Sequence, residues 1–252
     1  MPVFGKQDVQ AAAARAPLMS GLDTDPWELK GAEILQLSFE VVEEPAEWLA
    51  APALHPSIPP YATLSVARFP DSPVGPYALA QVRLVVRAGI RPRAYMIGAY
   101  TDSEQAAAAL RMRWGFPLEL ATVSLQARHD RVIGRVERDG QTILDMEAEN
   151  PEHISGSDVT YIDSLHLVRV NEGGEEKPLI VQIDPEYVFH AAQRGIPHLK
   201  TLDAEAWGAG DRLRCTSPMT ATFTRCDTDL PRLRFALDPS LPALQGSRKL
   251  LA

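Results

Sequence analysis

Cysteine and lysine are both scarce in this chain of 252 residues, which has two of the first and five of the second. The two cysteines, Cys215 and Cys226, lack the paired spacing of a zinc-binding motif. A disulfide between them is compatible with the sequence, but nothing indicates secretion, and residues 1–15 lack the apolar segment of a signal peptide. We therefore expect a cytoplasmic protein with reduced thiols.

Long hydrophobic runs and an excess of basic residues are also missing. No apolar segment is long enough to span a bilayer. The net charge of −8 and the pI near 5.3 argue against nucleic-acid binding. With 45% hydrophobic and 23% charged residues, the composition is that of a globular protein. The expectation is one domain over 1–252, with an N-terminal arm at 1–30, a C-terminal tail at 240–252, and neither membrane nor nucleic acid as a partner.

The common catalytic and cofactor motifs are absent as well. Gly208-Ala209-Gly210 lacks the third glycine and the preceding strand of a dinucleotide site. The chain has no phosphate loop of the Walker type and no Gly-x-Ser-x-Gly elbow. Its six histidines never pair at metal-ligand spacing, and we interpret His190 and His198 as structural. We expect no cofactor and no metal.

What the sequence does contain is a series of short segments rich in β-branched and aromatic residues, separated by turn residues. Asp139-Gly140 between two such segments predicts a tight hairpin. The absence of a βαβ rhythm favours a mainly β (α+β) protein of antiparallel sheets curled into a cone or barrel, with a few peripheral helices. The predicted strands are 34–42, 63–69, 77–86, 95–100, a hairpin of 131–138 with 141–147, a second of 159–170 with 178–183, a third of 212–216 with 220–226, and 232–237.

One helix interrupts the strands. Thr101 and Glu104 have capping-box spacing, and strong helix formers follow from Ala106 to Arg113. Gly115 ends this helix and Pro117 blocks its continuation. Shorter helical segments are predicted over 7–15, 45–50 and 186–193.

The segment Tyr100–Leu120 resembles the acetoacetate decarboxylase family. It reads Tyr-Thr-Asp-Ser-Glu, then a helix, then Arg111, Gly115 and Pro117. In that family a Tyr-x-Asp-x-Glu turn precedes the helix, and an Arg-Glu-x-x-Gly-x-Pro-Lys-Lys stretch follows it, whose first lysine forms the Schiff base. Gly75-Pro76-Tyr77 and Glu205-Ala206-Trp207 resemble two further family motifs. The resemblance covers most of 34–239 and implies a central cavity, a small-molecule substrate and a homo-oligomer.

The departures from the family pattern concern its chemistry. The position of the Schiff-base lysine falls at Leu118, the second lysine at Glu119, the essential glutamate at Leu79 and an early arginine at Phe39. An imine that drains electrons from a departing carboxylate requires a neutral amine, which leucine lacks. Lys200 is the remaining lysine that could reach a cavity, although a solvated loop position is the alternative.

The strand that begins at Tyr77 offers candidate substrate-binding residues. Alternate residues of a strand share one face, so Tyr77, Leu79, Gln81 and Arg83 point the same way. Because Leu79 falls at a family cavity position, Gln81 and Arg83 are expected to face inward nearby. The alternative is a solvated Arg83 at the end of the strand.

The segment after the predicted helix supplies the other candidates. Glu119 in an apolar pocket would have a raised pKa and act as general acid or base; the alternative is an exposed carboxylate paired with Arg111 or Arg113. Arg111 either binds a substrate carboxylate or holds the turn through backbone carbonyls. The remaining members, which form cavity wall or core, are Trp114, Phe116 and Leu118.

Together these residues predict an enzyme of the acetoacetate decarboxylase type that acts on a small carboxylate- or carbonyl-bearing molecule without an imine. Glu119 would transfer protons, and Arg111 with Arg83 would bind the anion. The reaction would be of the lyase, hydratase, isomerase or cyclase type. Two alternatives stay open: a non-catalytic protein that binds an apolar ligand in the same cavity, and a decarboxylase that uses Lys200.

Overall fold

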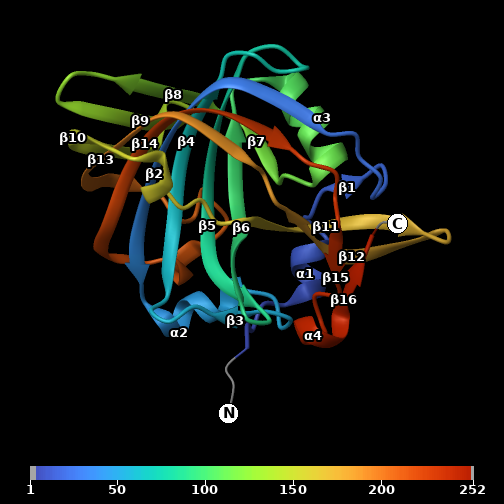
Figure 1. Ribbon diagram of the computed structural model, residues 1–252. Helices are drawn as coiled ribbons and strands as arrows, with labels where there is room; N and C mark the ends of the chain where they lie inside the picture. The colour runs from blue at the N-terminus through green and yellow to red at the C-terminus, as the bar shows by residue number, and fades with distance from the viewer. Residues whose placement is uncertain (1–3, 251–252) are drawn as a thin grey trace.

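The computed structural model describes residues 4–250, in which one large β-sheet holds most of the chain (Figure 1). The strands are β1 (Leu18–Met19), β2 (Trp27–Val41), β3 (His55–Pro56), β4 (Tyr61–Phe69), β5 (Tyr77–Ala88), β6 (Arg91–Thr101), β7 (Leu118–Leu120), β8 (Thr122–Ala127), β9 (Arg131–Arg138), β10 (Gln141–Ile154), β11 (Ser164–Glu172), β12 (Glu175–Ile183), β13 (Tyr187–Leu202), β14 (Cys215–Leu230), β15 (Phe235–Leu237) and β16 (Ser247–Lys249). The α-helices are α1 (Val9–Ala13), α2 (Glu43–Ala46), α3 (Glu104–Trp114) and α4 (Ala243–Gly246), and short 3₁₀ turns cover Glu47–Leu49, Gly156–Asp158 and Gly210–Arg212. None of the described helices combines the length and hydrophobicity needed to cross a bilayer.

The strands follow the order β16-β15-β12-β11-β6-β5-β4-β2-β14-β13-β10-β9-β8. In Figure 1, β10, β13 and β14 lie on one side of the molecule, and the β11–β12 hairpin extends from the other. The mainly β prediction is confirmed, but the sheet is mixed and does not close into a barrel. Within the described residues, β16 and β8 form its two ends and do not pair with each other. Parallel pairs form where β11 and β7 add to β6, because α3 carries the chain back over the sheet between β6 and β7.

Two of the predicted hairpins are confirmed. Asp139 and Gly140 both have positive φ angles, 51° and 77°, as a tight two-residue turn between β9 and β10 requires. Gly173 and Gly174 turn the chain between β11 and β12, although β11 begins later than expected, at Ser164.

The predicted central helix is confirmed with a different cap. Ser103 is the N-cap, and its hydroxyl accepts a hydrogen bond from the amide of Ala106 at 3.2 Å. Thr101 does not cap α3, because it belongs to β6 and donates its hydroxyl to the carbonyl of Ala78 at 2.7 Å. The helix ends at Gly115 with a φ of 64°, as predicted.

The helix expected over 186–193 is wrong. Residues 187–193 lie in β13, whose first part, 187–195, pairs with β14 and whose later part, 192–202, pairs with β10. Its run of Tyr187, Val188 and Phe189 suits a strand, and pairing on both sides outweighs the local helix formers that follow.

The third hairpin, of 212–216 with 220–226, is also wrong. Residues 215–216 and 220–226 belong to the single strand β14, which pairs with β2, and residues 212–214 precede that strand. Pro218 lies opposite Phe39 between two register shifts, where a residue without an N–H group can be accommodated. Proline therefore marks an irregularity in β14 and not a turn.

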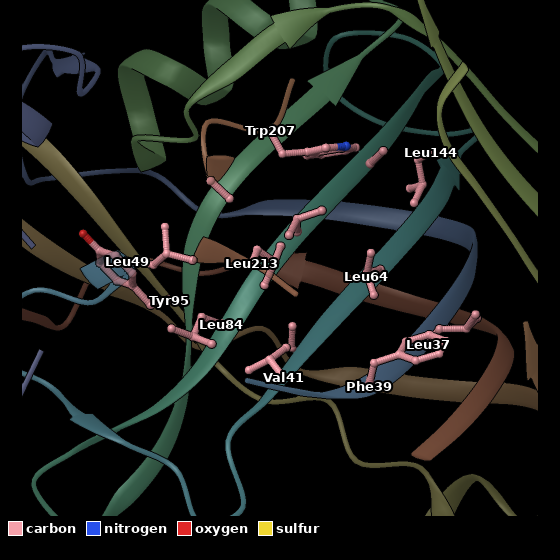
Figure 2. Packing of buried hydrophobic residues seen from close by; sticks show 14 of the residues in the cluster. Leu37, Phe39, Val41, Leu49, Leu64, Leu84, Tyr95, Leu144, Trp207 and Leu213 are labelled. Atoms are coloured by element: carbon pink, nitrogen blue, oxygen red, sulfur yellow. The ribbon is translucent and has the colours of Figure 1, made fainter. Parts of the chain in front are cut away.

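Hydrophobic cores lie on both faces of the central strands. Alternate residues of β2, among them Leu37 and Phe39, pack in the first core together with Leu64 of β4 (Figure 2). Leu79 of β5 and Trp114 of α3 belong to the second core, which α3 and the β11–β12 hairpin cover. Phe39 and Leu79, aligned above with two active-site positions of the family, therefore face opposite sides of the sheet.

Candidate functional site

A cavity of about 70 Å³ lies on the second-core side of the sheet. We call it the Arg83 cavity. It is lined by Leu29, Ile34, Gln36, Ser65, Ala67, Phe69, Tyr77, Leu79, Gln81, Arg83, Leu110, Phe116, Tyr161, Ser164, Ile183, Pro185, Tyr187, Thr228, Asp229 and Leu230.

Arg83 is the main charged group of this cavity, and its residue is only 8% exposed. Its guanidinium donates to Gln36 Oε1 at 2.7 Å and to Ser164 Oγ at 3.2 Å. Both partners are neutral, and within the described residues Nε has no hydrogen-bond partner and the side chain no ion pair. Burial lowers the pKa of Arg83, yet guanidinium keeps its proton in proteins. The result is a buried cation that makes no ion pair with a described residue, although the carboxylate of Asp229 lines the same cavity.

Two tyrosines face this arginine. The rings of Tyr161 and Tyr187 meet edge to face with centroids 4.9 Å apart, and the hydroxyls of Tyr161 and Thr224 lie 2.8 Å apart. Burial raises the pKa of Tyr187 to about 12, and the nearby Arg83 only partly opposes this. Both phenols are thus protonated near neutral pH and can donate hydrogen bonds to a ligand.

His166 lies behind the cavity wall and was not singled out by the sequence. Its ring packs edge to face on Phe116 with centroids 4.4 Å apart. Nδ1 donates to the carbonyl of Trp114 at 2.9 Å, so Nε2 carries the lone pair; it has no partner among the described residues. Burial is the main cause that lowers the pKa of His166 to about 3. The sequence signal that could have pointed to His166 is its position two residues after Ser164 in a predicted strand, because alternate residues of a strand share one face.

The histidines that the sequence analysis did discuss lie at the surface. His190 Nε2 is 3.3 Å from Asp227 Oδ2, and His198 Nε2 is 2.8 Å from Glu149 Oε2. Neither lines the Arg83 cavity.

A second hollow, of about 350 Å³, lies along β6, between the part of this strand that pairs with β11 and the part that pairs with β7. We call it the Glu119 cleft. Glu119 is 53% exposed there and pairs with Arg138 at 2.8 Å, not with Arg111 or Arg113. The apolar surroundings expected for Glu119 are therefore not observed. The cause is the alternation of β7, which turns Leu118 into the second core and Glu119 outward.

The predicted site residues are divided between these two hollows. The Arg83 cavity brings together Tyr77, Leu79, Gln81, Arg83 and Phe116. The Glu119 cleft holds Arg111, Leu118 and Glu119. Arg111 donates a hydrogen bond to the carbonyl of Leu118 and so holds the turn after α3. Trp114 lines neither hollow: its indole donates to the carbonyl of Pro231 at 2.8 Å within the second core.

No lysine lines either hollow among the described residues. Lys200 lies on β13 with its side chain 49% exposed, and its ammonium group is 2.6 Å from Glu147 Oε2. The other lysines, all of them exposed, are Lys6, Lys30, Lys177 and Lys249.

Solved structures with the same fold include acetoacetate decarboxylases and related enzymes. The acetoacetate decarboxylase of Legionella pneumophila is 17% identical with a TM-score of 0.72, and the match covers 83% of this chain and 86% of that one. An acetoacetate decarboxylase-like enzyme from Sphingomonas wittichii is 12% identical with a TM-score of 0.68, covering 91% and 95%. The enduracididine biosynthesis enzyme MppR, complexed with a condensation product of pyruvate, is 15% identical with a TM-score of 0.65, covering 85% and 91%.

At these identities the structural likeness shows the fold alone, and no curated protein sequence matches the chain significantly. The sequence model of a family does match: the one described as acetoacetate decarboxylase covers residues 13–191. Since this match spans well over half of the chain, the protein belongs to the acetoacetate decarboxylase family.

Proposed function

We propose that the protein is an enzyme that acts on a small carboxylate by acid/base chemistry without an imine, and that Arg83 binds the carboxylate. The observation that carries the proposal is the buried guanidinium that makes no ion pair with a described residue. An isolated buried charge is costly, and a bound anion removes that cost through charge-assisted hydrogen bonds.

The size of the Arg83 cavity limits the ligand. Each water-sized sphere needs roughly 10–15 Å³, so about 70 Å³ holds about five to seven such groups. This suits an acid of about three to five carbons. One related structure, that of MppR, is described as a complex with pyruvate, an acid of this size.

The residues around the cavity favour a reaction that needs no amine. Leu118 offers no nitrogen, and the lysines are exposed. Once a carboxylate is bound at Arg83, polar side chains of the cavity can donate hydrogen bonds to a carbonyl oxygen on the ligand and stabilise the negative charge that develops there. The available donors are Ser65, Gln81, Tyr161 and Tyr187. Transfer of a proton from the carbon next to such a carbonyl to the carboxylate of Asp229, which lines the cavity, would serve a lyase, hydratase, isomerase or cyclase.

The test uses Arg83→Met, which keeps the length of the side chain and removes its charge. Pyruvate binding is measured by calorimetry, and exchange of its methyl protons in D₂O by NMR. We expect the wild type to bind and to exchange, and Arg83→Met to bind at least about tenfold more weakly. Arg225→Met, which replaces an exposed arginine of β14 that lines neither hollow, is the matched control and should bind normally.

Each other outcome has a clear meaning. Binding that survives Arg83→Met contradicts the proposal. The protein could also bind pyruvate, lactate and 2-oxobutyrate through Arg83 and yet catalyse no exchange of the methyl protons of pyruvate. That result would instead support a non-catalytic binding protein.

The Glu119 cleft is a second candidate location for the chemistry. It is the larger hollow, and Arg138 joins Glu119 to the hydroxyl of Tyr100, which Arg138 contacts at 2.9 Å. If turnover takes place there, Glu119→Gln abolishes exchange and leaves folding intact. Unchanged exchange in Glu119→Gln together with its loss in Arg83→Met would place the reaction in the Arg83 cavity.

A further inference from the structure

The floor of the Arg83 cavity consists of rows of side chains across three neighbouring strands. Gln36 of β2 pairs with Ser65 of β4, which pairs with Gln81 of β5. Residues directly opposite in antiparallel strands point to the same face, so these three side chains form one polar row.

The next row on the same face is apolar. It contains Ile34, Ala67 and Leu79, two residues along each strand from the polar row. Two residues advance a strand by about 7 Å. Within that distance the floor changes from amide and hydroxyl groups to hydrocarbon.

Arg83 reaches over the polar row, because its guanidinium bonds to Gln36 at 2.7 Å. Two members of this row are uncommitted: the side chains of Ser65 and Gln81 make no hydrogen bond to any described residue. Ser65 is only 5% exposed, so its hydroxyl has little access to bulk water. A hydroxyl that lines a cavity and has no partner in the protein favours a ligand that supplies one.

The far end of the cavity offers hydrocarbon and no second cation. Phe69, Leu110 and Phe116 border the apolar row, and all three belong to the second core. Among the described lining residues Arg83 is the sole basic group, and the one carboxylate is that of Asp229. A second carboxylate on the ligand would be buried without a counter-charge.

We propose that the Arg83 cavity selects short monocarboxylic acids that carry an oxygen on C2 and hydrocarbon from C3 onward. The carboxylate binds Arg83, the oxo or hydroxyl group on C2 binds Ser65 and Gln81, and the alkyl tail packs on Ala67 and Leu79. This inference rests on the proposed function, and it excludes 3-oxo and 3-hydroxy acids as the preferred ligands. Their oxygen would lie against the apolar row and lose its hydrogen bonds to water.

Position isomers test the inference, because 2-hydroxybutyrate and 3-hydroxybutyrate have the same charge, atoms and volume. Calorimetry should show that the 2-isomer binds at least about tenfold more tightly, because its hydroxyl is hydrogen-bonded in the cavity whereas the hydroxyl of the 3-isomer is left without a partner. Butyrate, which has no such oxygen, should fall between them. Succinate should bind at least about tenfold more weakly than butyrate.

Two variants locate the preference. Ser65→Ala combined with Gln81→Met should weaken 2-hydroxybutyrate to the level of butyrate while butyrate itself keeps its affinity. Leu79→Asn, which adds polar groups to the apolar row, should bring the two isomers to within about threefold of each other. Unfolding curves of each variant check that it is folded, and either variant alone suffices for the test.

The results separate this inference from the proposed function. Equal binding of the two isomers that is lost in Arg83→Met would overturn the inference and leave the carboxylate site in place. Binding of neither acid, or binding that survives Arg83→Met, would overturn both.

Discussion

The functional argument begins with one residue whose chemistry conflicts with its surroundings. Arginine is rarely buried without an acidic partner, and Arg83 is held by an amide and a hydroxyl. Neutral partners satisfy part of its hydrogen-bonding capacity and none of its charge. The cost of burying a charge in this way is the physical basis of the carboxylate site that we propose.

His166 allows a prediction at the same scale. The pKa of this imidazole is about 3 in the folded protein and near 6.5 when it is unfolded. Between these values the unfolded chain binds a proton that the folded protein does not, so this group lowers stability as the pH falls from about 6.5 towards 3. Above pH 6.5 it has no effect. We expect the free energy of unfolding of the wild type to fall, relative to His166→Gln, by about 2 kcal/mol between pH 6.5 and 4.5.

Urea unfolding of both proteins across this pH range measures the difference. Glutamine keeps an N–H group that can donate to the carbonyl of Trp114 but does not titrate. Parallel curves for the two proteins would mean that His166 is accessible to protons in the folded state.

At the scale of elements, the turn after α3 sets the position of the cavity wall. Gly115 has a φ of 64°, and a Cβ at this residue would lie 2.0 Å from Cγ1 of Val168. A glycine is therefore needed both for the left-handed backbone and for the close approach of β11. The same turn directs Phe116 into the Arg83 cavity and Leu118 into the second core.

Gly115→Ala should destabilise the protein by about 2–4 kcal/mol, from left-handed strain combined with overpacking against Val168. Gly140→Ala is the matched control, because Gly140 has a φ of 77° and no atom within 4 Å of a Cβ added there. It should cost about 1 kcal/mol. Denaturant unfolding compares the two, and equal losses would show that Val168 moves aside.

At the scale of the whole molecule, the positions of the lysines support the proposal of a reaction without an imine. All of them are exposed, and Lys200 of β13 pairs with Glu147 of β10, away from both hollows. We expect borohydride treatment in the presence of pyruvate, 2-oxobutyrate or acetoacetate to leave every lysine unmodified. Mass spectrometry of the digested protein is the measurement, and a stoichiometric adduct on any lysine would contradict an imine-free reaction. The homo-oligomer implied by the family stays a prediction that light scattering can test.

Local sequence determined much of the architecture. Asp139-Gly140 specified its hairpin because those residues tolerate positive φ angles, and Gly115 specified the end of α3 for the same reason. The alternation of Tyr77, Leu79, Gln81 and Arg83 placed four side chains on one face, since strands have a period of two. The resemblance to the family could be found in residues 100–120 from the order of residue types alone, without any knowledge of the fold.

The tertiary structure decided the rest, because it depends on partners distant in the chain. β13 is a strand since β10 and β14 pair with both of its edges, which no local pattern reveals. Glu119 is separated from Arg83 because β7 pairs with β6 and turns successive side chains to opposite sides. The polar and apolar rows exist only through the register of β2, β4 and β5, and the isolated charge of Arg83 through the covering by α3, β11 and β12. Register and burial arise from packing between segments. The sequence could therefore name Tyr77, Leu79, Gln81, Arg83 and Phe116 but not the cavity residues that come from β2, β4, β11 and β13.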